Sequence, residues 1–124
     1  MTFLYWLGRT TEESVAIKLH RYLLNPEHTN VRGYLTGKAA WFRNNLGFTR
    51  YNAGELAKQI KFNRLSAQLA EPKDYGQKYY QVIKILGANG SSKNIEFIWI
   101  ENTDGIVRLV GVRRFPKYRG KKND

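Results

Sequence analysis

The spacing of apolar residues changes once along this chain, and the change separates two kinds of structure. In the first half the apolar residues recur at helical intervals, whereas from Tyr75 they alternate with polar ones. Thr10 and Glu13 fit a capping box at the start of a first helix, which Asn25-Pro26 ends. The apolar stripe of this helix is Val15, Leu19, Tyr22 and Leu23.

Two more helices are predicted before the alternating half. Thr36 is placed to cap a helix that runs through Lys38 and Trp41 to Leu46 and stops at Gly47. Asn52, with Glu55 three residues later, is placed to cap a third helix, whose apolar residues Leu56, Ile60 and Phe62 face inward. Residues 63–74 have weak periodicity and contain a proline, so we expect a connector there.

Three strands follow the connector. They are predicted over Lys78–Leu86, Asn94–Ile100 and Ile106–Val112. Asn89-Gly90 lies in the first link and Asp104-Gly105 in the second, and both dipeptides favour hairpin turns. The alternation puts Tyr79, Ile83 and Ile85 on one face of the first strand and Lys78, Tyr80, Val82 and Lys84 on the other.

Helices followed by strands, without βαβ alternation, predict the α+β class. We expect the N-terminal helices to pack on one face of the C-terminal antiparallel β-meander, with Trp41 and Trp99 in the core. The 124 residues fit one domain, 1–124, of which 113–124 reads as a basic tail.

Charge restricts the partners more than the pattern does. With 21 Lys and Arg against 10 Asp and Glu, the net charge of +11 favours phosphate backbones, anionic membranes or acidic proteins. No apolar stretch approaches the roughly 20 residues of a membrane span. The chain has no cysteine, which excludes disulfides and cysteine-ligated zinc. No nucleophile-elbow, zinc-protease or phosphate-loop motif is present, and the scattered carboxylates do not suggest a two-metal nuclease. We therefore expect neither a metal nor another cofactor.

An ordered series of short motifs resembles one known family. The motifs are an Asn-Pro-x-His loop, a KAAWF helix ending in LGF, LAKQI, YGQKY, GANG, FIWI and VRLV. Between Leu23 and Val112 they resemble the DUF6883-type C-terminal domains of bacterial polymorphic and contact-dependent growth inhibition toxins. Toxin domains of this layout are in turn similar to the barnase, EndoU, colicin and RelE group of metal-independent ribonucleases.

The resemblance implies a toxin-like ribonuclease that cleaves tRNA or other RNA in the bacterial cytoplasm and that can be delivered there from another cell. Cleavage without metal needs a base, an acid and a cation beside the phosphate. At the family motifs this chain offers His28, Lys38, Lys78 and Arg108. We predict proton transfer by His28 or Lys78 and phosphate binding by Lys38 and Arg108, with Lys78 and Arg108 in one groove.

Three further residues are predicted to bind substrate. Tyr75 and Tyr80 are placed to stack on bases, and the Thr103 hydroxyl is placed to bind a phosphate. Each of these residues also has an ordinary structural explanation, in sheet packing or in a turn. Two alternatives stay open: a non-catalytic basic module that binds nucleic acid, and an interaction domain that binds an acidic immunity protein.

Overall fold

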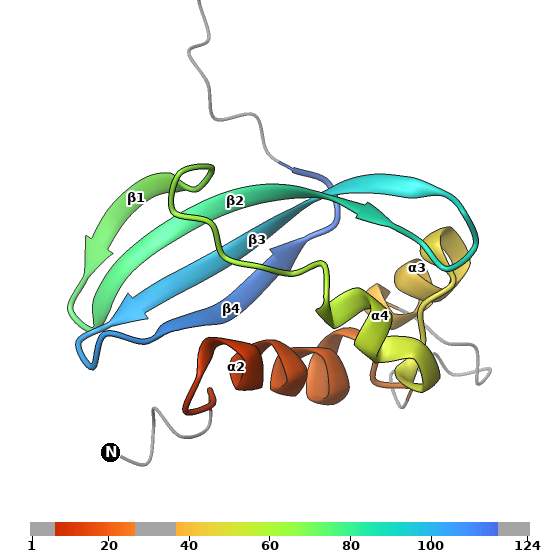
Figure 1. The fold of residues 1–124 in the computed structure, drawn as a ribbon, viewed down its shortest axis with the longest axis horizontal. Helices are drawn as coiled ribbons and strands as arrows, with labels where there is room; N and C mark the ends of the chain where they lie inside the picture. The colour runs from red at the N-terminus through yellow and green to blue at the C-terminus, as the bar shows by residue number, and fades with distance from the viewer. Residues whose placement is uncertain (1–6, 27–36, 117–124) are drawn as a thin grey trace, which may run out of the picture.

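The computed structural model describes residues 7–26 and 37–116, which form helices followed by an antiparallel sheet (Figure 1). The helical part contains α2 (Thr11–Lys18), the π-helix η1 (Leu19–Leu23), α3 (Gly37–Leu46), the 3-10 helix η2 (Arg50–Asn52) and α4 (Ala53–Ala57). The sheet contains β1 (Gln68–Lys73), β2 (Gly76–Leu86), β3 (Ser92–Asn102) and β4 (Val107–Arg113), hydrogen-bonded in that order. The predicted α+β class and the C-terminal meander are confirmed.

The first helix begins where its cap predicts. Thr10 Oγ1 accepts a hydrogen bond from the Glu13 backbone N–H at 3.0 Å, but the Glu13 carboxylate accepts from the N–H of Arg9 at 2.8 Å, one residue before the capping-box position. From Leu19 the helix continues in π form, and Leu24 N–H donates to Leu19 C=O. The predicted single helix is therefore two segments with different hydrogen-bond registers.

The third helix begins differently from the prediction. Thr49 Oγ1 caps η2 by accepting from Tyr51 N–H, while the Asn52 side chain accepts from Thr49 N–H at 2.8 Å and donates to Gly47 C=O at 2.9 Å. Asn52 consequently makes no side-chain cap on α4, and α4 ends at Ala57 instead of continuing toward Phe62.

The predicted connector contains a strand that the sequence did not indicate. β1 pairs antiparallel with β2 at the edge of the sheet, and its register is interrupted between Leu69 and Pro72. An edge strand with a bulge tolerates proline, because one of its sides needs no ladder hydrogen bonds. Five of the six residues of β1 are exposed, so the sequence of this strand has no alternation of apolar and polar residues from which it could be predicted.

The remaining strands form one long hairpin and a shorter partner. β2 and β3 stay in continuous register from Gly76 opposite Asn102 to Leu86 opposite Ser92. β4 then pairs with β3, with a register shift between Ile98 and Trp99. All three strands are slightly longer or shifted relative to the prediction, and Arg113, placed in the tail by composition, belongs to β4.

Alternate side chains of the strands join the helices in one hydrophobic cluster. Its members include Val15, Leu19, Leu23, Phe42, Leu46 and Leu56 from the helices and Tyr79, Ile85, Ile95, Phe97, Trp99 and Leu109 from the strands. Trp99 is fully buried as predicted, whereas Trp41 is partly buried and packs edge-on against Phe42. The Ser14 hydroxyl accepts the Leu109 N–H at 3.0 Å, which joins α2 to β4. No helix in the described part of the chain is long and apolar enough to cross a membrane.

Candidate functional site

Lys78 and Arg108 lie at the same level on the same face of the sheet. Both pair with Ile100 in the register, Lys78 from β2 and Arg108 from β4, so one strand separates them. We call this face, which carries Lys78, Tyr80, Ile98 and Ile100, the outer sheet face. Its side chains alternate with those of the hydrophobic cluster.

Two more predicted residues lie at the same end of the sheet. Tyr75 directly precedes β2, and Thr103 directly follows β3 in the turn to β4. The Asn102 side-chain amide donates to the Tyr75 carbonyl at 3.0 Å and so joins the two strand ends. Tyr80 lies two residues beyond Lys78 on the outer sheet face. The structure thus gathers Lys78, Arg108, Tyr75, Tyr80 and Thr103 in one region.

A pocket of about 440 Å³ opens on the outer sheet face in this region. Its floor is apolar, and it is lined by Leu7, Tyr75, Lys78, Ile98, Ile100, Asn102, Val110 and Gly111. A Cβ at position 111 would lie only 3.2 Å from Ile98 Cδ1. Because glycine has no side chain, this part of the pocket floor is formed by Ile98 and the backbone of Gly111. Arg108 does not line the pocket.

Lys78 lies between an acidic and an aromatic side chain. Its Nζ is 3.7 Å from Glu71 Oε1 and 5.3 Å from the centroid of the Tyr80 ring, and 23% of its side chain is exposed. Glu71 Oε1 also lies 3.9 Å from Lys73 Nζ. The pKa of Glu71 is lowered, first by a hydrogen bond from its own backbone and then by these two lysines, so Glu71 is ionised at neutral pH. Sequence reasoning missed Glu71 because β1 was assigned to a connector.

The Arg108 guanidinium makes its hydrogen bonds to other groups of the protein. Its Nε donates to Gly8 C=O at 2.6 Å, Nη1 donates to Asn102 Oδ1 and Asp104 Oδ1, and Nη2 donates to Asp104 Oδ2 at 2.9 Å. The residue is 1% exposed. These bonds fasten the β3–β4 turn to the segment that precedes α2, and the Arg108 hydrogen bond lowers the pKa of Asp104. The guanidinium is therefore a structural anchor behind the pocket.

The other predicted cations do not join this region. Lys38 is partly buried in the first turn of α3, where its Nζ lies 5.3 Å from the Tyr22 ring centroid. Ala39 and Phe42 of α3 are buried on the helical side of the molecule. His28 and Thr36 lie outside the described residues, so the structure does not place His28 relative to Lys78.

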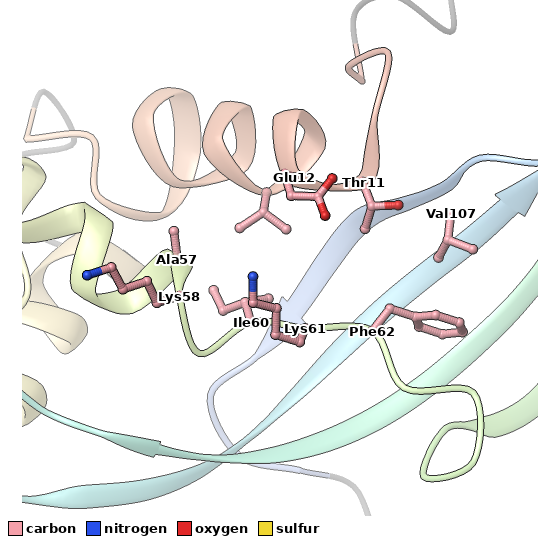
Figure 2. A pocket seen from close by; sticks show the side chains of 9 residues that line it. Thr11, Glu12, Ala57, Lys58, Ile60, Lys61, Phe62 and Val107 are labelled. Atoms are coloured by element: carbon pink, nitrogen blue, oxygen red, sulfur yellow. The ribbon is translucent and has the colours of Figure 1, made fainter.

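A second pocket, of about 370 Å³, lies between α2 and the segment after α4 (Figure 2). Glu12 from α2 and Lys61 from that segment are on opposite walls, and Phe62 and Val107 border one end. No residue predicted to be functional lines this pocket.

Beside the second pocket, Arg64 connects the chain after α4 to the sheet. Its Nη1 donates to Tyr79 Oη at 2.6 Å and to Glu101 Oε1 at 2.9 Å. The hydrogen bond from Arg64 lowers the pKa of Glu101. Phe62 packs edge-on against Tyr79 with ring centroids 5.3 Å apart. The carboxylate and the guanidinium satisfy each other, so this cluster is a packing contact that holds residues 62–64 on β2 and β3.

Within residues 7–26 and 37–116, no group of three or more His, Asp or Glu side chains is placed to hold a metal ion. No curated protein and no solved structure is significantly similar to this chain. One family model matches residues 12–116, a range that runs from the second residue of α2 past the end of β4 and contains every residue that lines the pocket on the outer sheet face except Leu7. The chain therefore belongs to DUF6883, a family described as a domain of unknown function.

Proposed function

We propose that this protein is a metal-independent ribonuclease that binds RNA on the outer sheet face. The observation that carries the proposal is the position of Lys78, at the rim of an open pocket, beside the Glu71 carboxylate and above the Tyr80 ring. Metal-free cleavage of RNA requires a base, an acid and a cation beside the phosphate; the Glu71 carboxylate supplies the base, the Lys78 ammonium supplies the acid and the cation, and the aromatic rings nearby can stack on bases.

In this proposal the helices cover one face of the sheet and leave the other to the substrate. Figure 1 supports the arrangement, since α2 and α4 are drawn below the sheet and α3 is drawn beside the end of the β2–β3 hairpin. The net charge of +11 attracts a polyanion to the remaining surface. Tyr75, which is 50% exposed, is available to stack on a base at the pocket rim.

The proposed reaction is attack of a ribose 2′-oxygen on the adjacent phosphorus. Glu71 accepts the proton of the 2′-OH, and Lys78 stabilises the negative charge that develops on the phosphoryl oxygens. The new O–P bond gives a 2′,3′-cyclic phosphate as the bond to the 5′-oxygen breaks. Lys78 then supplies the proton to the leaving 5′-oxygen. Arg108 supports the pocket through Asn102 and Asp104 rather than touching the phosphate.

The biological setting is proposed from the resemblance to toxin domains. There the substrate is tRNA or other RNA of the bacterial cytoplasm, reached after delivery from another cell. An acidic immunity protein would neutralise such a domain by covering the cations that bind RNA.

The direct test is incubation of the purified full chain with tRNA or total RNA in excess EDTA. We expect discrete fragments that end in a 2′,3′-cyclic phosphate. Lys78→Ala is expected to lower the cleavage rate by about 100-fold or more, because Lys78 both stabilises charge and transfers a proton. Lys84→Ala is the matched control, because Lys84 is exposed on the same face of β2, six residues from Lys78. This variant is expected to cleave RNA at the rate of the original protein.

Binding measured separately distinguishes the alternatives. With a 2′-O-methyl RNA, which lacks the attacking hydroxyl, Lys78→Ala is expected to bind within about threefold of the original protein. RNA that stays intact but binds with strong salt dependence would instead identify a non-catalytic nucleic-acid-binding module. If the protein neither binds nor cleaves RNA, the remaining alternative is an interaction domain that binds an acidic protein.

A further inference from the structure

Two lysines from different helices meet at one tyrosine ring on the helical side of the molecule. Lys18, the last residue of α2, has its Nζ 5.1 Å from the Tyr22 ring centroid. Lys38, in the first turn of α3, has its Nζ 5.3 Å from the same centroid. Tyr22 belongs to η1 and is 49% exposed, so the cluster is open to solvent. We call these three residues the Tyr22 cluster.

The positive charge of the Tyr22 cluster is not neutralised by the described residues. Neither Lys18 nor Lys38 lies within ion-pair distance of a carboxylate there, and α3 has no acidic residue in its first turn. The nearby Tyr22 ring stabilises each ammonium group, but it supplies no counter-charge.

The positive charge of Lys38 also acts on Lys18. The pKa of Lys18 is lowered, first by burial and then by the positive charge of Lys38. A further cation is held on the same helical segment, because the Arg50 guanidinium donates through Nε and Nη2 to His20 C=O, at 3.1 Å and 2.5 Å. Cations brought together without a carboxylate attract a multiply charged anion more strongly than scattered ones do.

We propose that the Tyr22 cluster is a phosphate-binding site for an RNA strand, separate from the pocket at Lys78. The two sites involve different elements: Lys18 and Lys38 belong to α2 and α3, whereas Lys78 belongs to the outer sheet face of β2. Figure 1 labels these three elements. The partner class rests on the proposed function, but RNA cleavage is not required.

Two neighbouring phosphodiesters of one strand, one at each ammonium group, relieve the repulsion between the lysines while releasing condensed cations from the RNA. Both effects weaken as salt rises. For a single strand each neutralised phosphate contributes about 0.7 to the slope of log K against log salt. Loss of both lysine contacts is therefore expected to reduce the magnitude of that slope by about 1.4.

The experiment measures binding of the full chain to a fluorescein-labelled, single-stranded 2′-O-methyl RNA by anisotropy over a series of salt concentrations. The test variant is Lys18→Ala/Lys38→Ala. The control Lys58→Ala/Lys93→Ala removes the same charge at two other exposed lysines, on α4's C-terminal side and on β3. The test variant is expected to lose about tenfold in affinity at about 150 mM salt, with the smaller slope, while the control loses about twofold.

Lys18→Arg/Lys38→Arg keeps both charges and is expected to restore most of the affinity and the slope, provided all variants keep the far-UV circular dichroism of the original protein. Equal losses in the test and control variants, or no RNA binding by the original chain, would overturn the proposal. Because this RNA cannot be cleaved, the test is independent of catalysis: selective loss of binding together with uncleaved RNA in the EDTA assay would reject the ribonuclease and retain this site.

Discussion

Replacing Arg108 by alanine is the sharpest test of the structural role assigned to this residue. Arg108 is 1% exposed and donates to the Gly8 carbonyl, to Asn102 and to both carboxylate oxygens of Asp104. If these contacts anchor the β3–β4 turn to the segment before α2, the substitution must lower the free energy of unfolding. If Arg108 instead serves only a ligand, stability should hardly change.

The magnitude follows from what the substitution leaves behind. The Gly8 carbonyl is buried and Asn102 is 4% exposed, so each loses a donor in a place that water reaches poorly. An unsatisfied buried acceptor costs about 1–3 kcal/mol, so the two acceptors together cost about 2–6 kcal/mol. Asp104, whose side chain is 36% exposed, recovers part of its hydration and adds less. From the two buried acceptors we expect a loss of about 3–5 kcal/mol in the free energy of unfolding.

Urea unfolding followed by tryptophan fluorescence measures this loss, since Trp99 is fully buried in the core. With a denaturant slope of about 2 kcal/mol per molar, the midpoint should fall by about 2 M. Arg64→Ala is the matched control, because Arg64 also bonds a carboxylate oxygen at 2.9 Å but has 55% of its side chain exposed. Solvent screening makes that pair weak, so a small midpoint change is expected.

Arg108→Lys keeps the charge but not the planar fork, and it should fall between the original protein and alanine. It also provides a measurable variant if Arg108→Ala does not fold. Equal midpoints for the arginine-to-alanine variants at positions 108 and 64 would refute the reasoning, because burial is the difference that the prediction depends on.

Three further outcomes test other parts of the structure. The folded-state pKa of Asp104 is depressed below its ordinary 3.8. The ionised carboxylate therefore stabilises the fold above pH 3.8, and this stabilisation is lost as the pH falls through the folded-state pKa. The difference in urea midpoint between the original protein and Asp104→Asn should accordingly become smaller in acid. Gly76→Ala should unfold at lower temperature than Gly90→Ala, because both glycines have positive φ but only at Gly76 does a Cβ collide with a backbone carbonyl of β3. Ser14→Ala should cost about 1–3 kcal/mol in urea unfolding by removing the acceptor of the Leu109 N–H.

The sheet was predictable where its strands alternate and its turns contain glycine. Gly90 and Gly105 both adopt positive φ in the links between β2, β3 and β4, as the Asn-Gly and Asp-Gly dipeptides indicate. β1 was missed because it lies at the edge and buries no side chain of its own, so it has no apolar period to detect. Its position is fixed by contacts with the next strand, such as the Gln77 side chain of β2 donating to Ala70 C=O.

The helices show the same limit at their ends. Thr10 identified the start of α2, since its cap is a local contact with Glu13. The change to π form at Leu19 has no equivalent local signal. Asn52 has the spacing of a cap, yet its side chain bonds Thr49 and Gly47 behind it, because the chain turns there before α4 begins. Local spacing identifies a possible cap but not the competing partner that tertiary structure supplies.

The two strand cations show why the candidate site could be predicted only in part. The sequence predicted one groove for Lys78 and Arg108 and did not distinguish the two cations. The strand register places both on one face of the sheet. Their difference comes from partners: Arg108 bonds Asp104, four residues earlier across the turn, and the carbonyl of Gly8, a hundred residues away. Lys78 faces Glu71 on the unpredicted strand and keeps 23% of its side chain exposed, against 2% for Arg108. Loss of activity after changing Arg108 must therefore be compared with unfolding before it is assigned to catalysis, whereas Lys78 can be tested in a folded protein.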